Sequence, residues 1–149
     1  GRFMKYILAL ALSLFIASTC ANNLSEIKDA STDMTKNNKI NYIEIPAQNI
    51  AATKTFFSGV FGWSFVDYGP EYSSFAAQGV DGGFFKSELV VSTKNGSPLI
   101  VLYSDSLEAT QDKIEKAGGK IIKPIFSFPG GRRFHFSDPN GNEFAVWSE

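Results

Sequence analysis

Apolar and polar residues alternate along two runs near the C-terminus, with a short polar segment between them. In residues 132–137 and 143–147 every second position is apolar, which is typical of strands with one buried face. The intervening Asp138-Pro139-Asn140-Gly141-Asn142 has turn chemistry, since proline presets φ and glycine allows a positive φ. The sequence therefore predicts a hairpin that places Ser137 opposite Glu143, Phe136 opposite Phe144 and His135 opposite Ala145.

Side-chain parity separates this hairpin into two different faces. Phe134, Phe136, Phe144 and Val146 share one face, which is uniformly apolar and is expected to lie under a helix. The other face is mainly polar, with one aromatic residue and one alanine, and it carries Arg133, His135, Ser137, Glu143, Ala145 and Trp147. We expect the second face to carry the chemistry.

A similar order of elements occurs twice in the chain. Aligning 48–53 with 105–110 matches strands 40–46 and 99–103, and it places Asn49 and Ser106 as equivalent helix N-caps. Glycines at 62 and at 118–119 end the two helices. The expected helix stripes are Ile50, Phe57 and Val60, and then Leu107, Ile114 and Ala117. Further strands are expected at 63–68, 72–78, 83–87 and 120–125, with an extended connector at 89–94 that turns at Asn95-Gly96. The pattern predicts an α+β fold of two βαβββ modules, about 40–96 and 97–149.

Several motifs carry a resemblance to a known superfamily. They are Tyr42-Ile43-Glu44-Ile45-Pro46, Phe56-Phe57-Ser58-Gly59-Val60-Phe61-Gly62-Trp63, Gly82-Gly83-Phe84-Phe85-Lys86, Ala117-Gly118-Gly119-Lys120 and the closing turn. In this order the chain resembles the vicinal oxygen chelate (VOC) superfamily of glyoxalases, bleomycin-resistance proteins and dioxygenases. It is most similar to the small proteins related to lactoylglutathione lyase. The resemblance implies a cup-shaped mixed sheet with helices on its outer face.

The resemblance also implies where a metal would bind. Metal-using relatives supply ligands from the first strand of each half and from the last strands, and the matching positions here are Tyr42, Leu99, Lys86 and Ala145. None of these side chains suits a hard divalent ion, so we expect no metal and no other cofactor. A shifted site made of Glu44, His135 and Glu143 is the alternative, although it has a single imidazole.

Candidate ligand-binding residues follow from the same parity. They are Tyr42, Glu44, Lys86, Arg133, His135 and Trp147, and the candidates for proton transfer are His135, Glu44 and Glu143. Arg133 and Lys86 suit an anionic molecule, whereas the aromatic residues suit flat walls. The structural alternatives are a packed histidine and cations that are solvated or paired with Glu44 or Glu143.

Composition bounds the size and the partners of the protein. The chain has 149 residues, 44% of them hydrophobic, and a formal net charge of −1, which suits one globular domain. Without a run of basic residues, nucleic acid is not expected as a partner. The resemblance adds a homodimer as an expected assembly.

The N-terminal residues 1–21 have the composition of a secretory signal peptide, with an apolar run at 7–17 that is short for a membrane span. Cys20, the only cysteine, is placed like the lipidated residue of a bacterial lipoprotein. Cleavage after Ala21, which would release a secreted soluble protein, and an uncleaved anchor are the alternatives. Residues 22–39 are polar and predict a flexible tether before a domain at 40–149. We expect an exported protein of the cell envelope or periplasm that meets the membrane only through a lipid anchor.

Three functions are consistent with these features. The first is metal-free binding of a small organic ligand in the cup. The second is an enzyme of the VOC type, a lyase, isomerase or dioxygenase with an atypical site. The third is a non-catalytic interaction protein of the cell envelope.

Overall fold

The computed structural model describes residues 36–149, and the elements lie in one compact unit, Tyr42–Glu149. In chain order they are β1 (Tyr42–Ala47), α2 (Ile50–Phe61), β2 (Phe65–Asp67), β3 (Tyr72–Phe75), β4 (Asp81–Lys86), η1 (Thr93–Asn95), β5 (Ile100–Tyr103), α3 (Leu107–Lys116), β6 (Lys120–Phe128), β7 (Gly131–Ser137) and β8 (Glu143–Ser148). Each half of the chain thus gives one βαβββ module, and the predicted α+β class is confirmed.

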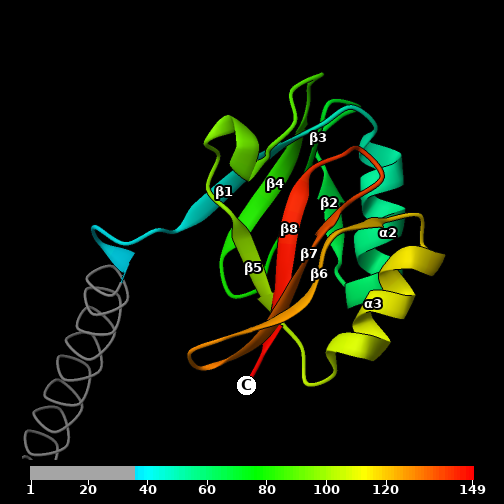
Figure 1. Ribbon diagram of the computed structural model, residues 1–149. Helices are drawn as coiled ribbons and strands as arrows, with labels where there is room; N and C mark the ends of the chain where they lie inside the picture. The colour runs from blue at the N-terminus through cyan, green and yellow to red at the C-terminus, as the bar shows by residue number, and fades with distance from the viewer. Residues whose placement is uncertain (1–35) are drawn as a thin grey trace, which may run out of the picture. The chain divides into compact units, whose positions relative to one another are not determined.

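The strands form two open four-stranded mixed sheets, with order β1-β4-β3-β2 in the first module and β5-β8-β7-β6 in the second. In each sheet the first and last strands of the module run parallel, and the other pairs are antiparallel. Both helices lie on the same side of the strands (Figure 1). We call the opposite side of each sheet its helix-free face.

Helix α2 begins and ends as its sequence predicts. The Asn49 side chain accepts a hydrogen bond from the Ala52 amide at 3.0 Å, and Gly62 adopts the left-handed conformation, with φ of 72°, that ends the helix. The buried side of the helix carries Thr53, Phe56, Phe57 and Val60. Phe57 is central because its ring packs on Phe84 of the first sheet, at 5.4 Å, and on Phe144 of the second, at 5.2 Å.

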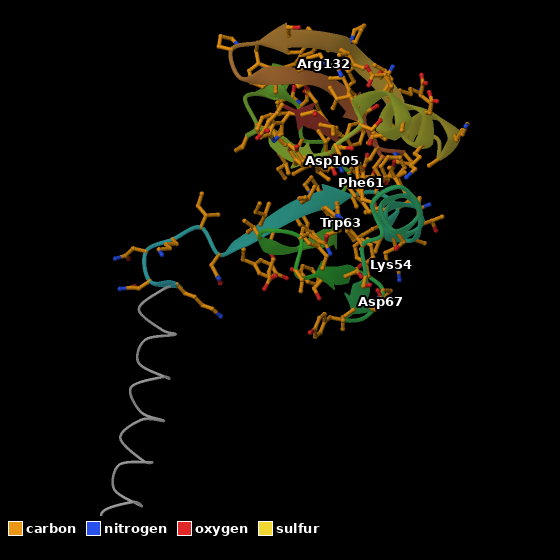
Figure 2. All side chains as sticks on the ribbon, turned by 90° about the horizontal axis from the view of Figure 1, so that it is seen from below. Lys54, Phe61, Trp63, Asp67, Asp105 and Arg132 are labelled. Carbon is orange, nitrogen blue, oxygen red and sulfur yellow. The ribbon has the colours of Figure 1, made fainter. Side chains whose placement is uncertain are left out.

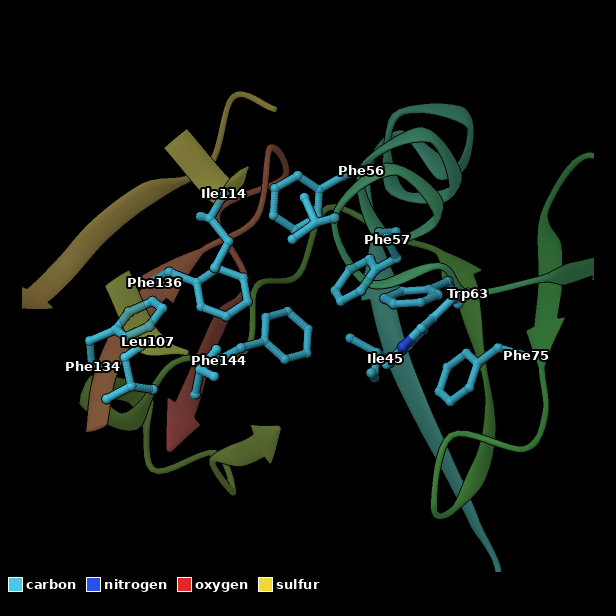
Figure 3. Packing of buried hydrophobic residues seen from close by; sticks show 14 residues of the cluster. Ile45, Phe56, Phe57, Trp63, Phe75, Leu107, Ile114, Phe134, Phe136 and Phe144 are labelled. Atoms are coloured by element: carbon cyan, nitrogen blue, oxygen red, sulfur yellow. The ribbon is translucent and has the colours of Figure 1, made fainter. Parts of the chain in front are cut away.

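The two modules share one hydrophobic core, which Figure 3 shows in close-up. The predicted buried face of the closing hairpin is confirmed, since Phe134, Phe136, Phe144 and Val146 are all fully buried. The register is also as predicted, with Ser137 opposite Glu143, Phe136 opposite Phe144 and His135 opposite Ala145. Burying these rings supplies about 2 kcal/mol or more each, which makes the core the main source of stability.

The closing turn joins the modules through one buried side chain. Asn142 Nδ2 donates to the Pro46 carbonyl at the end of β1, at 2.7 Å, and its Oδ1 accepts from the Val91 amide in the connector, at 3.0 Å. Asn142 is fully buried. Within the turn, Asp138 accepts from the backbone amides of Asn140 and Asn142. The turn therefore fixes the second sheet to the first module as well as reversing the chain.

Some local expectations differ from the structure. Ser106 makes no side-chain cap bond; instead Thr110 donates to the Ser106 carbonyl, and the Ser106 amide donates to Ser104. Ala117, predicted to belong to the buried stripe of the second helix, is exposed and lies just after the last residue of α3, Lys116. The connector, expected to be extended, ends in the short helix η1, which Gly96 terminates with a φ of 79°.

Candidate functional site

A buried, hydrogen-bonded pair of a carboxylate and an imidazole lies on the helix-free face of the second sheet. Glu143 on β8 and His135 on β7 approach to 3.1 Å between Oε1 and Nδ1, and both side chains are about nine-tenths buried. Three donors from the connector also reach Glu143: the Ser92 hydroxyl at 3.1 Å, the Thr93 amide at 2.7 Å and the Thr93 hydroxyl at 2.9 Å, all to Oε2. The connector thus covers this face and explains why Glu143 is buried.

These contacts set the protonation of the pair. Burial alone raises the pKa of Glu143, but the bonds from His135, Thr93 and Ser92 outweigh it and lower the pKa to about 2. An ionised carboxylate can only accept, so His135 donates to Glu143 through Nδ1. The other ring nitrogen, Nε2, is buried without a partner among the described residues. The carboxylate therefore fixes the orientation of the imidazole.

Cations and aromatic rings surround this pair. The Arg133 guanidinium lies over the rings of Phe126 and Phe128, at 5.1 and 5.4 Å from their centroids, and Lys123 Nζ lies 3.9 Å from the Phe126 centroid. The Phe126 ring is also 6.0 Å from that of His135. The buried Nε of Arg133 has no partner in the described part of the chain. Arg133 and His135 thus each present an unsatisfied polar atom within one cluster.

Trp147 forms an aromatic wall on the same face, next to Arg133 in the ladder. Its ring meets Tyr103 edge to face at 5.3 Å and Phe128 at 6.3 Å. Tyr103 is 52% exposed, so the wall is open to solvent. This part of the face can stack a flat ring beside the cations.

The candidates of the first module form a separate group. Tyr42 and Tyr72 share a hydrogen bond of 2.8 Å between their hydroxyls, and the Tyr72 hydroxyl donates to Glu44 at 3.2 Å. Burial, together with Tyr42 and Glu44, raises the pKa of Tyr72. The Tyr72 hydroxyl lies directly over Gly83, where a Cβ would collide with it. Among the described residues, no hydrogen bond or ion pair joins this group to His135 and Glu143.

Lys86 does not lie with the other candidates. It follows Phe84 by two residues, so it shares the helix side of β4, and its Nζ donates to the Gln48 carbonyl just before α2. Alignment of the Gly82-Gly83 segment with Gly141-Asn142 makes Lys86 the repeat equivalent of Ala145, but the strand registers contradict this: Val101 pairs with Ala145, and its repeat equivalent Glu44 pairs with Gly83. Phe84, on the same side of β4, is fully buried in the core.

The donor set does not fit a divalent metal. The positions that correspond to the ligands of metal-using relatives carry a tyrosine hydroxyl bonded to Tyr72, the apolar Leu99 and Ala145, and, with the register corrected, Gly83. Among residues 36–149 no group of three His, Cys, Asp or Glu side chains is placed to hold an ion. The shifted alternative is not assembled either, since Glu44 bonds to Tyr72 while His135 and Glu143 bond to each other.

Four residues of the site were not indicated by the sequence pattern, namely Ser92, Thr93, Lys123 and Phe126. Thr93 and Glu143 are 50 positions apart, and the contact depends on where the connector crosses the second sheet. Lys123 and Phe126 lie on β6, where two register shifts break the simple alternation from which parity is inferred. The only local sign of this irregularity in the sequence is Pro124, because proline within a strand is typical of an edge or a bulge.

The predictions for the N-terminus fall mainly on residues that the structure does not describe. The signal peptide at 1–21, Cys20 and most of the tether at 22–39 lie outside residues 36–149. Within the described part, none of the helices has the length and apolar character needed to span a membrane.

The paired βαβββ modules with open mixed sheets define the class of fold, and comparison with known families and solved structures gives the same class. Residues 39–146 match the model of the Glyoxalase/Bleomycin resistance protein/Dioxygenase superfamily. The chain belongs to this superfamily, as the resemblance implied.

A glyoxylase-like domain-containing protein of Didymella fabae is 31% identical, with 76% of this chain and 95% of the relative covered. CFP32 of Mycobacterium tuberculosis, of glyoxylase type by its name, is 25% identical over 72% of this chain, which spans only 44% of that relative's length.

Solved structures show the same fold at low sequence identity. A glyoxalase-related enzyme from Fulvimarina pelagi superposes with a TM-score of 0.63 at 17% identity, over 74% of this chain and 87% of that one. The lactoylglutathione lyase of Agrobacterium tumefaciens gives 0.56 at 18% identity, over 75% and 94%. These likenesses concern the fold alone.

Proposed function

We propose that this VOC-domain protein binds a small organic molecule, without a metal, on the helix-free face of its second sheet. The observation that carries the proposal is a pair of buried polar atoms beside the open Trp147 wall, His135 Nε2 and Arg133 Nε, which have no partner within residues 36–149. A buried polar atom without a partner costs about 1–3 kcal/mol, and a ligand that bonds to it recovers that energy.

The ligand we infer is an aromatic molecule that carries an anionic group. Lys123 and Arg133 both contact the Phe126 ring, so positive charge gathers at one place, while Glu143 is already bonded to four donor groups. An anion near Arg133 gains charge-assisted bonds, and a flat ring stacks on Trp147.

The test is calorimetry and thermal shift with a panel of aromatic carboxylates and their neutral amides. Neighbouring arginines give a matched pair, because Arg132 lies on the opposite side of β7 and bonds to Glu108 at 2.7 Å. We expect Arg133→Gln to weaken carboxylate binding about tenfold or more and Arg132→Gln to leave it unchanged. Saturable binding that responds equally to both substitutions, or no saturable binding at all, contradicts the proposal.

Catalysis is a second candidate function, favoured by the Glu143–His135 pair. With Nδ1 held by the carboxylate, Nε2 is oriented to take a proton from a bound molecule. Metal analysis of the purified protein, and turnover of the methylglyoxal–glutathione adduct with added nickel or zinc, separate the two functions. Stoichiometric bound metal, or turnover that is lost in His135→Gln, supports the enzyme and removes the metal-free binding proposal.

Export and assembly complete the proposal. We propose an exported protein anchored through Cys20, and we expect Cys20→Ala to move it from the membrane fraction to the soluble fraction. If that variant partitions like the parent, lipidation does not hold the protein at the membrane.

A homodimer is the assembly we propose. Large apolar side chains are exposed on the helix-free faces, among them Val66 (58%), Val101 (43%) and Tyr103 (52%), which supports this assembly. Gel filtration with light scattering of the purified protein measures its mass.

A further inference from the structure

A cavity lies between the two modules, and neither His135 nor Glu143 lines it. It has a volume of about 620 Å³, and its lining comes from β1, the end of α2, the loop before β4 and the segment through β5. Figure 2 shows the two modules next to each other, with Phe61 near their junction and Trp63 in the first module. The volume lies in the range of small-molecule pockets, roughly 300–1,000 Å³.

The lining of this cavity carries no charged side chain. Its fourteen residues are aliphatic or aromatic, apart from Gln78 and Gly79. An ion placed here would lose its hydration without a counter-charge, so the cavity discriminates against anions and cations alike. This is the opposite preference to that of the Arg133 face.

Two strand edges border the same cavity. β1 and β5 each stand at the end of their sheet, and both line the space. An edge strand leaves alternate backbone N–H and C=O groups unpaired, and these can bond to polar atoms of a neutral molecule. The cavity therefore offers hydrogen bonds without charge.

Trp63 forms part of the wall. Its ring stacks on Phe57 at 4.7 Å and contacts Phe75 at 4.6 Å, so two neighbours fix its position. The ring is 9% exposed and lines the cavity. A flat ligand entering the cavity would meet a preformed aromatic surface.

We propose that this space between β1 and β5, here called the intermodule cavity, binds a neutral, mainly apolar molecule of one or two rings. The cavity adjoins the Arg133 face at Tyr103, which lines the cavity and contacts Trp147, but its lining includes none of Lys123, Arg133 and His135. The ligand proposed here is therefore distinct from the anionic one. The volume, the uncharged lining and the two open strand edges together specify the ligand class.

The two tryptophans of the chain allow each face to be observed separately. In the full chain with Trp147→Phe, Trp63 is the only fluorophore of its kind, and 4-bromobenzyl alcohol is a neutral heavy-atom quencher. We expect saturable, one-to-one quenching of Trp63. We expect 4-bromobenzoate, which has the same ring with a negative charge, to bind at least about tenfold more weakly.

Matched variants locate the binding. Leu99→Arg places a cation in the lining, whereas Leu89→Arg makes the same change at a connector residue that is 69% exposed and lies outside it. Gln78→Arg is a second lining variant at an exposed position, and it keeps the test decisive if Leu99→Arg unfolds in circular dichroism.

We expect the lining variants to weaken binding of the alcohol about tenfold and Leu89→Arg to leave it unchanged. Linear, non-saturable quenching, equal binding of alcohol and benzoate, or equal effects of all three variants overturns the proposal. Loss of quenching as the protein concentration rises also overturns it, since a second copy would then occupy the cavity.

Discussion

Replacing Asn142 by alanine should lower the free energy of unfolding by more than the loss of so small a side chain suggests. The side chain is fully buried and bonds to two different segments, the Pro46 carbonyl at 2.7 Å and the Val91 amide at 3.0 Å. Alanine removes both bonds and leaves their partners in place. The exposed connector residue Asn95 offers a matched Asn→Ala control.

The magnitude follows from how well each stranded group can reach water. Pro46 is buried, so its carbonyl loses a partner at a cost of about 1–3 kcal/mol. Val91 is half-buried, and water can partly replace its lost partner, which leaves about 1 kcal/mol. We therefore expect Asn142→Ala to lower the free energy of unfolding by about 3 kcal/mol, or roughly 12 °C in melting temperature.

Urea unfolding followed by circular dichroism measures this change, provided that the slope with urea is the same in parent and variant. Asn95→Ala should stay within about 0.5 kcal/mol of the parent. A loss below about 1 kcal/mol in Asn142→Ala would show that the turn does not join the modules energetically and would refute the argument.

Two further predictions concern charge and close packing. The pKa of Glu143 is lowered from 4.5 to about 2, so its stabilising contribution is complete above pH 4.5 and is lost as the pH falls toward 2. The loss should approach roughly 3 kcal/mol in acid unfolding curves and be absent in Glu143→Gln; equal acid sensitivity of parent and variant would contradict it. At Gly83 an added Cβ collides with Tyr72, so Gly83→Ala should cost about 1–3 kcal/mol in the parent. In a Tyr72→Ala background the cost should largely vanish, and a double-mutant cycle that shows simple additivity would exclude the contact.

The closing hairpin could be predicted from sequence because its information is local. Turn residues 138–142 set the register, and strict alternation then assigned each side chain to a face, so Phe136 and His135 lie on opposite sides as expected. The Asn49 cap and the Gly62 end of α2 were also local signals and are confirmed.

The rest of the site depends on how distant segments meet. Lys86 was misplaced because the segments Gly82-Gly83 and Gly141-Asn142 are not equivalent in the repeat, and an alignment error by an odd number of residues moves a side chain to the other face of a strand. Thr93 reaches Glu143 only because the connector crosses the second sheet. The intermodule cavity next to Trp63 arises from the placement of two edge strands, which neither module encodes by itself.

The neighbours Asn142 and Glu143 have a consequence for the order in which the protein folds. Their partners Pro46, Val91 and Thr93 are made early during synthesis, whereas the two residues themselves leave the ribosome about 50 to 100 positions later. Contacts this distant along the chain form slowly, because a large loop must close before they are gained. A nascent chain that stops before residue 142 therefore lacks these bonds between the modules, although most of its core residues have already been made.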